Sequence, residues 1–123
     1  YAFISLSPRL AQIRFVQTSV IEVATGNQPA AANITPDVAE FCSGKGDGLV
    51  SVFVPHATAG VAIFETGDGS EPDVLAAIDE LLPAEPGRWN HAAHGSPGHG
   101  RDHVVPAFIS PSLVVPVVGG RLQ

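Results

Sequence analysis

The stretch LVSVFVPHATAG, residues 49–60, decides how this chain folds. Its first part is almost entirely apolar and rich in valine, which predicts a buried β-strand over Leu49–Pro55. The strand ends at His56, and four small residues follow it. Small residues at a strand end let backbone N–H groups approach an anion, and Thr58 adds a hydroxyl, so the stretch predicts an anion site. An ordinary tight connection between two strands explains the same residues equally well.

The residues before this strand predict a helix. Thr35 is suited to the N-cap, and Pro36 follows it at the first helical position, where a missing N–H is tolerated. The helix is expected to end at about Cys42, before a glycine-rich turn at 44–48. Cys42 is the single cysteine of the chain, which excludes an internal disulfide and favours a small buried apolar residue.

A second helix is predicted after the strand. Ser70 begins it, with Asp73 three residues later in an arrangement that resembles a capping box. Apolar residues then recur at helical spacing between Val74 and Leu82, and Pro83 ends the helix.

The remaining elements are strands and one long loop. Residues 83–102 show no periodicity, and a loop of that length in a small domain is usually functional or disordered. The order of elements predicts one α+β domain over residues 1–123, with two helices and a largely antiparallel sheet. Beyond the strand at Leu49–Pro55, the predicted strands are Ile13–Val23, Val61–Glu65, Val104–Ile109 and Leu113–Val118.

The end of the sequence predicts a hairpin. Gly119 and Gly120 form a turn signal directly after the last predicted strand, and three residues follow them. Because a return strand needs more residues than that, we expect the chain to be truncated after Gln123 and to continue for roughly 15–25 residues.

Composition excludes several classes of function. The chain of 123 residues carries a formal net charge of -6, and its six basic residues are scattered, which argues against nucleic-acid binding. Residues 103–120 hold no formally charged side chain, but prolines and glycines interrupt them, so a membrane span is not expected. The N-terminus lacks the basic flank of a signal peptide, and a cytoplasmic location is the remaining expectation.

The histidines are the main candidates for chemistry. Four of the five, His91, His94, His99 and His103, fall within a stretch of thirteen residues. Histidine is the commonest metal ligand and the usual proton carrier near neutral pH. The spacing matches no named zinc signature. Two interpretations therefore stay open, a metal or catalytic site and a polar, glycine-rich surface loop.

Other residues of these loops could support such a site. Glu65 and Asp102 could orient imidazoles or bind a hard cation, or they could be solvated turn residues. Arg101 could hold a phosphate group, although a single loop arginine is more often a surface charge. Trp89 could line a pocket or anchor the loop on the core, and the anchor is the favoured interpretation.

Three runs of the sequence point to a known family. They are ITPDV at 34–38, DGLVSVFVPHATAG at 47–60, and the stretch from 103 through SPSL at 110–113 to 121. Over roughly residues 12–123, these runs resemble the YjbQ-like family, which is often labelled secondary thiamine-phosphate synthase. The resemblance implies an α+β fold, a homotrimer, and a site built from the His-x-Thr-Ala run, a following glutamate and two loop histidines. Carried over to this sequence, those residues are His56, Thr58, Glu65, His91 and His103.

The sequence departs from the family pattern at four places. Ala57 stands where threonine is usual, and Phe64-Glu65-Thr66 replaces Asn-Glu-Asn. Arg101 stands where an aspartate is usual, with Asp102 at the next position as a substitute. The Gly-Thr-Trp-Gln motif expected after Leu122 is absent, in agreement with the expected truncation.

The resemblance implies a small metal- or phosphate-binding enzyme. Its reaction would join a hydroxymethylpyrimidine pyrophosphate to a thiazole phosphate and release pyrophosphate. The alternatives are a non-catalytic trimer that binds or senses a metal or metabolite, and a structural trimer whose histidines line a polar channel. The expected partners are other copies of the chain and a small phosphorylated metabolite.

Each expected site residue has a role in this hypothesis. A divalent metal, zinc or magnesium, would be held by His56, His91 and His103. His94 and His99 are both expected to be less tightly placed, with His94 as the substitute ligand. The residues expected to act in catalysis are His56, Glu65 and His103. The residues expected to bind phosphate are Thr58, Ala59, Gly60 and Arg101.

Overall fold

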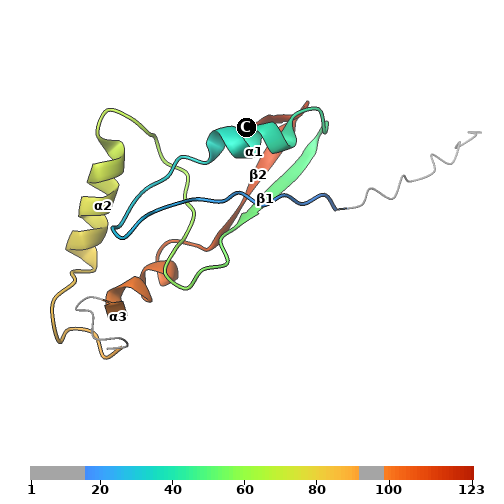
Figure 1. Ribbon diagram of the computed structural model, residues 1–123. Helices are drawn as coiled ribbons and strands as arrows, with labels where there is room; N and C mark the ends of the chain where they lie inside the picture. The colour runs from blue at the N-terminus through green and yellow to red at the C-terminus, as the bar shows by residue number, and fades with distance from the viewer. Residues whose placement is uncertain (1–15, 92–98) are drawn as a thin grey trace, which may run out of the picture.

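The centre of the fold is a three-stranded antiparallel sheet, in the order β1-β2-β3, as seen in the computed structural model (Figure 1). The structure describes residues 16–91 and 99–123. Strand β1 (Gly48–Phe53) pairs with β2 (Ser112–Val118), which pairs with the short β3 (Arg121–Leu122). The sheet confirms an α+β fold with antiparallel strands.

The turn between β2 and β3 is the predicted hairpin. Gly119 and Gly120 both have positive φ, at 58° and 78°, a region that side chains other than glycine rarely adopt. A Cβ on Gly120 would also lie 2.9 Å from the backbone nitrogen of Gly44, so no larger residue fits there. The amide of Gly119 donates to Asp47 Oδ1 at 2.7 Å, which fixes the turn beside the start of β1.

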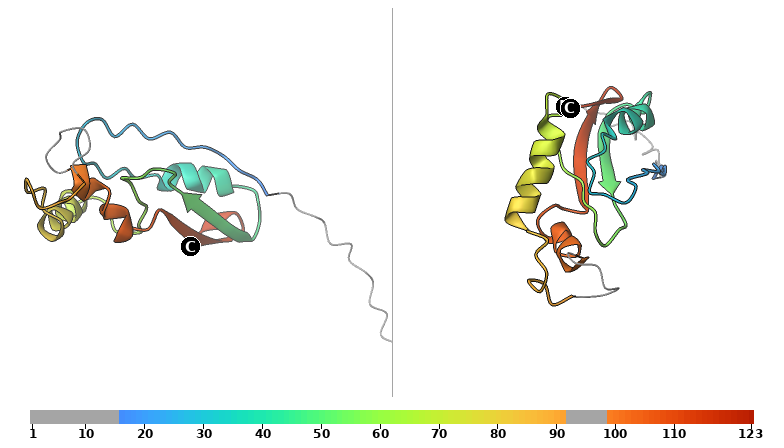
Figure 2. Two further views of the ribbon diagram at one scale, coloured as in Figure 1. Left: turned by 90° about the horizontal axis from the view of Figure 1, so that it is seen from below. Right: turned by 60° about the vertical axis from the view of Figure 1, so that its left-hand side comes forward.

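Helix α1 (Thr35–Cys42) covers one face of the sheet, as Figures 1 and 2 show. Its N-terminus differs from the prediction, because Ile34 occupies the N-cap and Asn33 Oδ1 accepts from the Thr35 amide at 2.9 Å. Successive strand residues alternate between faces, so alternate side chains of β1 and β2 meet this helix. The buried cluster consists of Val38, Cys42, Val50 and Val117, which confirms Cys42 as a core residue.

The other face of the sheet is uncovered by the described residues and is apolar. Leu49 and Phe53 of β1 are 74% and 64% exposed, and Val114 and Val118 of β2 are 57% and 54% exposed. Leu49 pairs with Pro116 and Ser51 pairs with Val114, and paired residues lie on the same face of a sheet. Because alternate residues of a strand also share a face, all four exposed residues lie on one face. We call these four residues the open sheet face.

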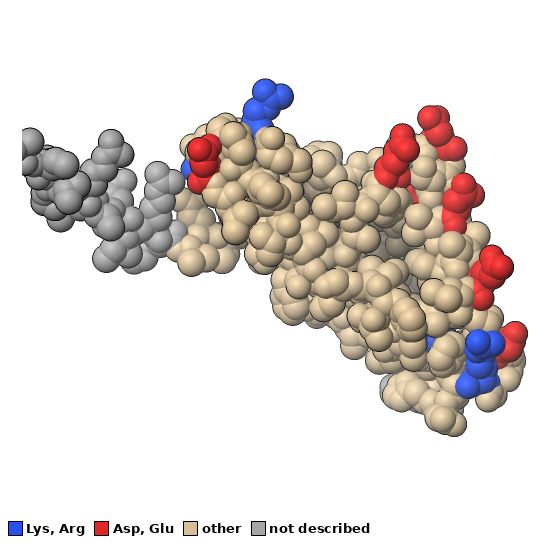
Figure 3. Space-filling model, turned by 180° about the vertical axis from the view of Figure 1, so that it is seen from behind, with Lys and Arg blue, Asp and Glu red and all other residues tan. Residues whose placement is uncertain are grey.

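Helix α2 (Ser70–Leu81) lies to one side of the sheet, in the predicted range. Its N-terminus is stabilised differently from the prediction. Both carboxylate oxygens of Glu71 accept from the Gly67 amide at 3.0 Å, and Ser70 makes no capping bond. Figure 3 shows acidic side chains along the edge of the molecule that carries α2, and the helix contains Glu71, Asp73, Asp79 and Glu80.

Two predicted strands are extended segments without a β ladder. In Ile13–Val23, residues 13–15 lie outside the described part, and residues 16–23 belong to no sheet, with Val16 and Val20 90% and 87% exposed. Val61–Glu65 also pairs with no strand, and one amide, that of Val61, donates to Ser110 O at 2.8 Å. Strand-like composition predicted these segments, but pairing depends on a neighbouring edge.

A third predicted strand, Val104–Ile109, is a pair of tight turns. A short helix α3 (His99–Asp102) precedes it, and a 3-10 turn η2 (Val105–Ala107) occupies its centre. The φ angle that Pro106 imposes fits such a turn, and proline cannot donate to a strand ladder. The two-helix prediction missed α3 because four residues are too few to show periodicity. None of the helices in residues 16–91 and 99–123 is long and apolar enough to cross a bilayer.

Candidate functional site

Three histidines converge at the end of the molecule that carries α3. His91, His99 and His103 each offer one ring nitrogen, and these nitrogens all lie within 4.8 Å of one another. The ring centroid of His103 is 4.7 Å from those of both His91 and His99. Three nitrogens bound to one zinc ion at about 2.0–2.1 Å are about 3.3 Å apart, so small side-chain movements would bring these rings onto one ion.

The spacing of two of these histidines explains their proximity. His99 opens α3 and His103 follows its last residue, so the pair is four positions apart and shares one helical face. Their Nε2 atoms are 3.1 Å apart. One ring therefore donates and the other accepts, and a metal ion could replace the shared proton.

The opposite side of α3 is fixed to α2. Arg101 is 8% exposed, and its Nη2 lies 2.5 Å from Asp79 Oδ1. The Nε of Arg101 is buried without a hydrogen-bond partner among residues 16–91 and 99–123. Arg101, expected as a phosphate ligand, is thus engaged in an ion pair that docks the histidine-bearing turn onto its neighbour.

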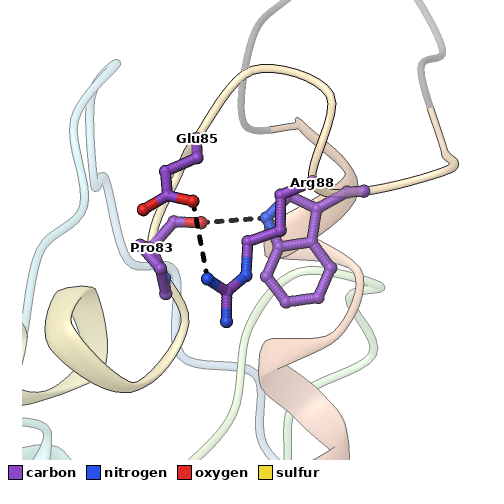
Figure 4. Close-up of polar contacts among 4 residues, drawn as sticks. Pro83, Glu85 and Arg88 are labelled. Carbon is purple, nitrogen blue, oxygen red and sulfur yellow. Dashed lines mark hydrogen bonds and ion pairs between the residues drawn. The ribbon is translucent and has the colours of Figure 1, made fainter.

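His91 is positioned by the residue two places before it. The indole Nε1 of Trp89 donates to the carbonyl oxygen of Pro83 at 2.9 Å, which ties the loop to the end of α2 (Figure 4). The guanidinium of Arg88 lies 5.6 Å from the centre of the indole ring and pairs with Glu85 at 3.5 Å. These contacts confirm Trp89 as an anchor of the loop.

Gly100 lets the two halves of the site come together. A Cβ at this position would lie 2.5 Å from the carbonyl oxygen of His91 and 2.6 Å from Trp89 Cβ. The backbone of α3 therefore touches the backbone of the His91 segment directly, which brings the ring of His91 to the His99–His103 pair.

The environment of His103 favours its neutral form. Loss of surrounding water lowers its pKa below the ordinary value of 6.5, although the residue as a whole is exposed. Positive charge on His91, His99 and His56 lowers the pKa further, while the carboxylate of Asp102 opposes this effect. A histidine that stays neutral in mildly acidic solution keeps a lone pair available for a metal ion.

His56 is close enough to influence this pKa, but it makes different contacts. Its Nδ1 accepts from the backbone amide of Thr58 at 3.3 Å, and Thr58 Oγ1 lies 3.1 Å from the same atom. In the described part of the chain, the group of close ring nitrogens contains His99 and not His56. The expectation that His99 is less tightly placed is therefore wrong. His94 lies outside the described residues.

The loop after His56 is held along residues 109–111. The amides of Val54 and Val61 donate to Pro111 O and Ser110 O, each at 2.8 Å. A Cβ on Gly60 would lie 2.5 Å from Ile109 O, so close packing requires glycine there. The loop thus passes beside the η2 turn that follows α3 (Figure 1).

The other expected site residues differ in their surroundings. Ala59 and Gly60 are half-buried residues, and their amides donate to no acceptor among the residues that the structure describes. The amide of Thr58 is engaged by His56. Glu65 is exposed and makes no hydrogen bond or ion pair within the same residues.

Sequence reasoning missed three positioning features of this site. The i, i+4 spacing of His99 and His103 was a usable signal, because two helix residues at that spacing commonly bind one metal ion. The Arg101–Asp79 ion pair and the approach at Gly100 join segments distant in sequence and leave no local signal.

One protein-family model matches most of this chain. The family model described as UPF0047 protein YjbQ-like matches residues 19–123. A UPF0047 protein of Mycobacterium tuberculosis is 50% identical over 106 residues, which cover 86% of this chain and 77% of the relative.

Solved structures of similar proteins share the fold. A conserved hypothetical protein of Thermus thermophilus superimposes with a TM-score of 0.65 at 31% identity, covering 75% of this chain and 70% of that one. A YjbQ/UPF0047 protein of Clostridium acetobutylicum gives a TM-score of 0.64 at 27% identity, covering 77% of each chain. These likenesses agree with the antiparallel α+β architecture.

Proposed function

The chain belongs to the YjbQ-like UPF0047 family, and we propose that it binds a divalent metal ion of the zinc type through His91, His99 and His103. The observation that carries this proposal is the approach of three ring nitrogens to within 4.8 Å of one another. The lowered pKa of His103 supports it, because a ligand must be unprotonated.

The chemistry of the donors favours zinc over magnesium. Imidazole nitrogens suit zinc, whereas magnesium prefers carboxylate, phosphate and water oxygens. Three protein ligands would leave a fourth position for water or a ligand, as in catalytic zinc sites. Two of the three histidines are exposed and His99 is half-buried, so a small molecule could reach that position.

A candidate reaction for this site is the thiamine-phosphate synthase reaction. The exocyclic carbon of a pyrimidine pyrophosphate would form a bond to the thiazole nitrogen as its bond to the pyrophosphate oxygen breaks. A metal ion there would neutralise charge on the leaving pyrophosphate. The amides of Ala59 and Gly60, which donate to no acceptor in residues 16–91 and 99–123, would contribute hydrogen bonds to its oxygens. The family resemblance supports this activity as a side reaction of the site.

The second candidate is a non-catalytic module that binds a metal ion or a metabolite. It is favoured by the position of Glu65, the expected acid or base, which is exposed and contacts no histidine by hydrogen bond in the described part of the chain. Measured turnover of the two phosphorylated substrates by the metal-loaded protein distinguishes the candidates. Product formation above the rate of the metal-free protein favours the enzyme, and its absence favours the module.

The open sheet face supports the expected homotrimer. Leu49, Phe53, Val114 and Val118 form an apolar surface of a kind that monomeric proteins rarely leave in water. We propose that other copies of this chain cover it, in a closed cyclic assembly. A cytoplasmic location also stays a prediction.

Elemental analysis of the purified protein tests the metal proposal first. One zinc ion per chain, retained through buffer exchange and removed by a chelator, is the expected result. A metal-free protein that also fails to take up added zinc would refute the proposal.

A further inference from the structure

His56 and Thr58 together fix which ring nitrogen of His56 carries the proton. The backbone amide of Thr58 points its hydrogen at His56 Nδ1 across 3.3 Å. A backbone N–H can only donate, so Nδ1 must be the unprotonated acceptor. A neutral imidazole carries its proton on the other nitrogen, which is Nε2 here.

This arrangement makes His56 unsuited to binding the metal ion. Its Nδ1 lone pair is occupied by Thr58, whose Oγ1 also lies 3.1 Å from the same atom. Its Nε2 bears a hydrogen and has no lone pair for a cation. His91, His99 and His103 already supply three ring nitrogens, the number found in catalytic zinc sites.

From this contact we infer that His56 is a hydrogen-bond donor that holds a phosphate group at the open position of the metal site, and is not a metal ligand. The inference rests on the proposed metal site. The phosphate would accept a hydrogen bond from Nε2–H while another of its oxygens faces the cation.

The residues that flank His56 in the sequence offer donors and no acidic side chain. The half-buried residues Ala59 and Gly60 follow His56, and their amides have no acceptor in the described part of the chain. Residues 54–61 contain no acidic side chain. A phosphate oxygen accepts hydrogen bonds from such donors, whereas a cationic ligand would find no partner among them.

The placement of the loop brings these donors toward the histidines. Close contact of Gly60 with Ile109, and the bonds of Val54 and Val61 to residues 110 and 111, hold the loop beside the η2 turn. In the chain that turn comes directly after α3, which carries His99.

The test compares zinc and phosphate binding in four full-length chains: the unmodified protein, His56→Ala, His56→Gln and His103→Ala. Zinc affinity is measured by competition with a chelator, and inorganic phosphate is titrated calorimetrically into metal-loaded and metal-free protein. His56→Ala should leave zinc affinity within about 3-fold and weaken phosphate binding by about 10- to 100-fold, the cost of one hydrogen bond to a charged group. His56→Gln keeps an N–H donor and should recover part of the loss. The exposed position of His56 lets both variants keep the fold, which circular dichroism checks.

The possible outcomes distinguish a failure of the proposed role of His56 from a failure of the proposed metal site. If His56→Ala loses zinc as severely as His103→Ala, His56 is a ligand and the inference is overturned, while a metal site stands. If His56→Ala changes neither affinity, or the zinc-loaded unmodified protein binds no phosphate, the inference is also overturned. Failure of the unmodified protein to bind zinc, together with phosphate binding that requires His56, would refute the metal site and leave the donor role of His56 intact.

A second titration with methyl phosphate distinguishes the source of the phosphate group. Binding of methyl phosphate within about 3-fold of inorganic phosphate supports a phosphorylated metabolite, because the site then has room for an organic substituent. Binding of inorganic phosphate alone supports a site for the free anion. Both results support phosphate as the ligand class.

Discussion

The Nε2 atoms of His99 and His103 lie 3.1 Å apart, across a single turn of backbone that begins with α3. Two neutral imidazoles at this distance share one proton, and a divalent cation can replace that proton. The third ring, that of His91, reaches the pair from the loop before α3, with ring centroids 5.4 Å from His99 and 4.7 Å from His103.

Replacing His99 with alanine should abolish tight zinc binding. The substitution removes one of three ligands, and we expect the affinity to fall by about 100-fold or more, beyond the 10- to 100-fold loss that follows removal of a residue supporting a metal ligand. Asn90→Ala, beside His91 and also exposed, is the control and should bind zinc normally. Equal zinc affinity of His99→Ala and the unmodified protein would remove His99 from the site.

The pKa of His103 should be lower than 6.5 in the metal-free protein, since loss of water and the neighbouring histidines all disfavour its charged form. The folded state therefore binds this proton less tightly than the unfolded chain does. Its contribution favours folding above pH about 6.5 and is lost as the pH falls below that value toward the lowered pKa.

Nuclear magnetic resonance titration of the ring protons measures this pKa directly. Replacing His91 with asparagine removes one repelling charge and should raise the pKa of His103. Replacing Asp102 with asparagine removes the attracting charge and should lower it further. Shifts of the opposite sign would contradict the electrostatic description of the site.

Removing only the anionic partner of the Arg101–Asp79 ion pair should lower the free energy of unfolding more than removing the buried cation does. Asp79→Asn leaves the buried guanidinium without its anion and should lower the free energy of unfolding by about 1–2 kcal/mol, a figure kept small because the Asp79 side chain is 60% exposed. Arg101→Met removes the buried charge and keeps an apolar chain of similar length, so its cost should be smaller.

Urea unfolding of the two metal-free variants gives the comparison. A larger loss for Arg101→Met than for Asp79→Asn would show that the packing of the arginine, and not its charge, docks α3 onto α2.

The open sheet face should determine the oligomeric state. Light scattering of the unmodified protein should give about three times the mass of the 12.7 kDa chain. Val114→Glu places a charge within this face and should reduce the mass to that of one chain, because burying an unpaired carboxylate is costly. Leu81→Glu on α2, where the leucine is 61% exposed, is the control and should keep the assembly. A monomeric unmodified protein would refute the trimer.

The sequence predicted correctly those helices and strands whose signals come from residues adjacent in the chain. The continuous apolar run of Leu113–Val118 and the two glycines after it predicted β2 and its hairpin, because both signals depend on adjacent residues. Pro36 and the helical spacing after Ser70 predicted α1 and α2 in the same way.

The failures concern contacts between distant segments. Val61–Glu65 has the composition of a strand, but its pairing depends on whether an edge is free nearby, which composition does not encode. Of the predicted set His56, His91 and His103, the structure brings His91 and His103 together, with His99 as the third ring. Choosing between His56 and His99 required the path of the loop beside Ile109 and the contact of Gly100 with His91, which only the folded backbone provides.

The proposed metal site is tested most directly by an anomalous difference map, recorded at the zinc edge from crystals of the full-length protein grown with zinc. This site should give one strong peak about 2.0–2.1 Å from a ring nitrogen of each of His91, His99 and His103, with His56 outside the first coordination sphere. The absence of a peak among these three rings, or a peak bound by His56 in place of His99, would contradict the proposed site.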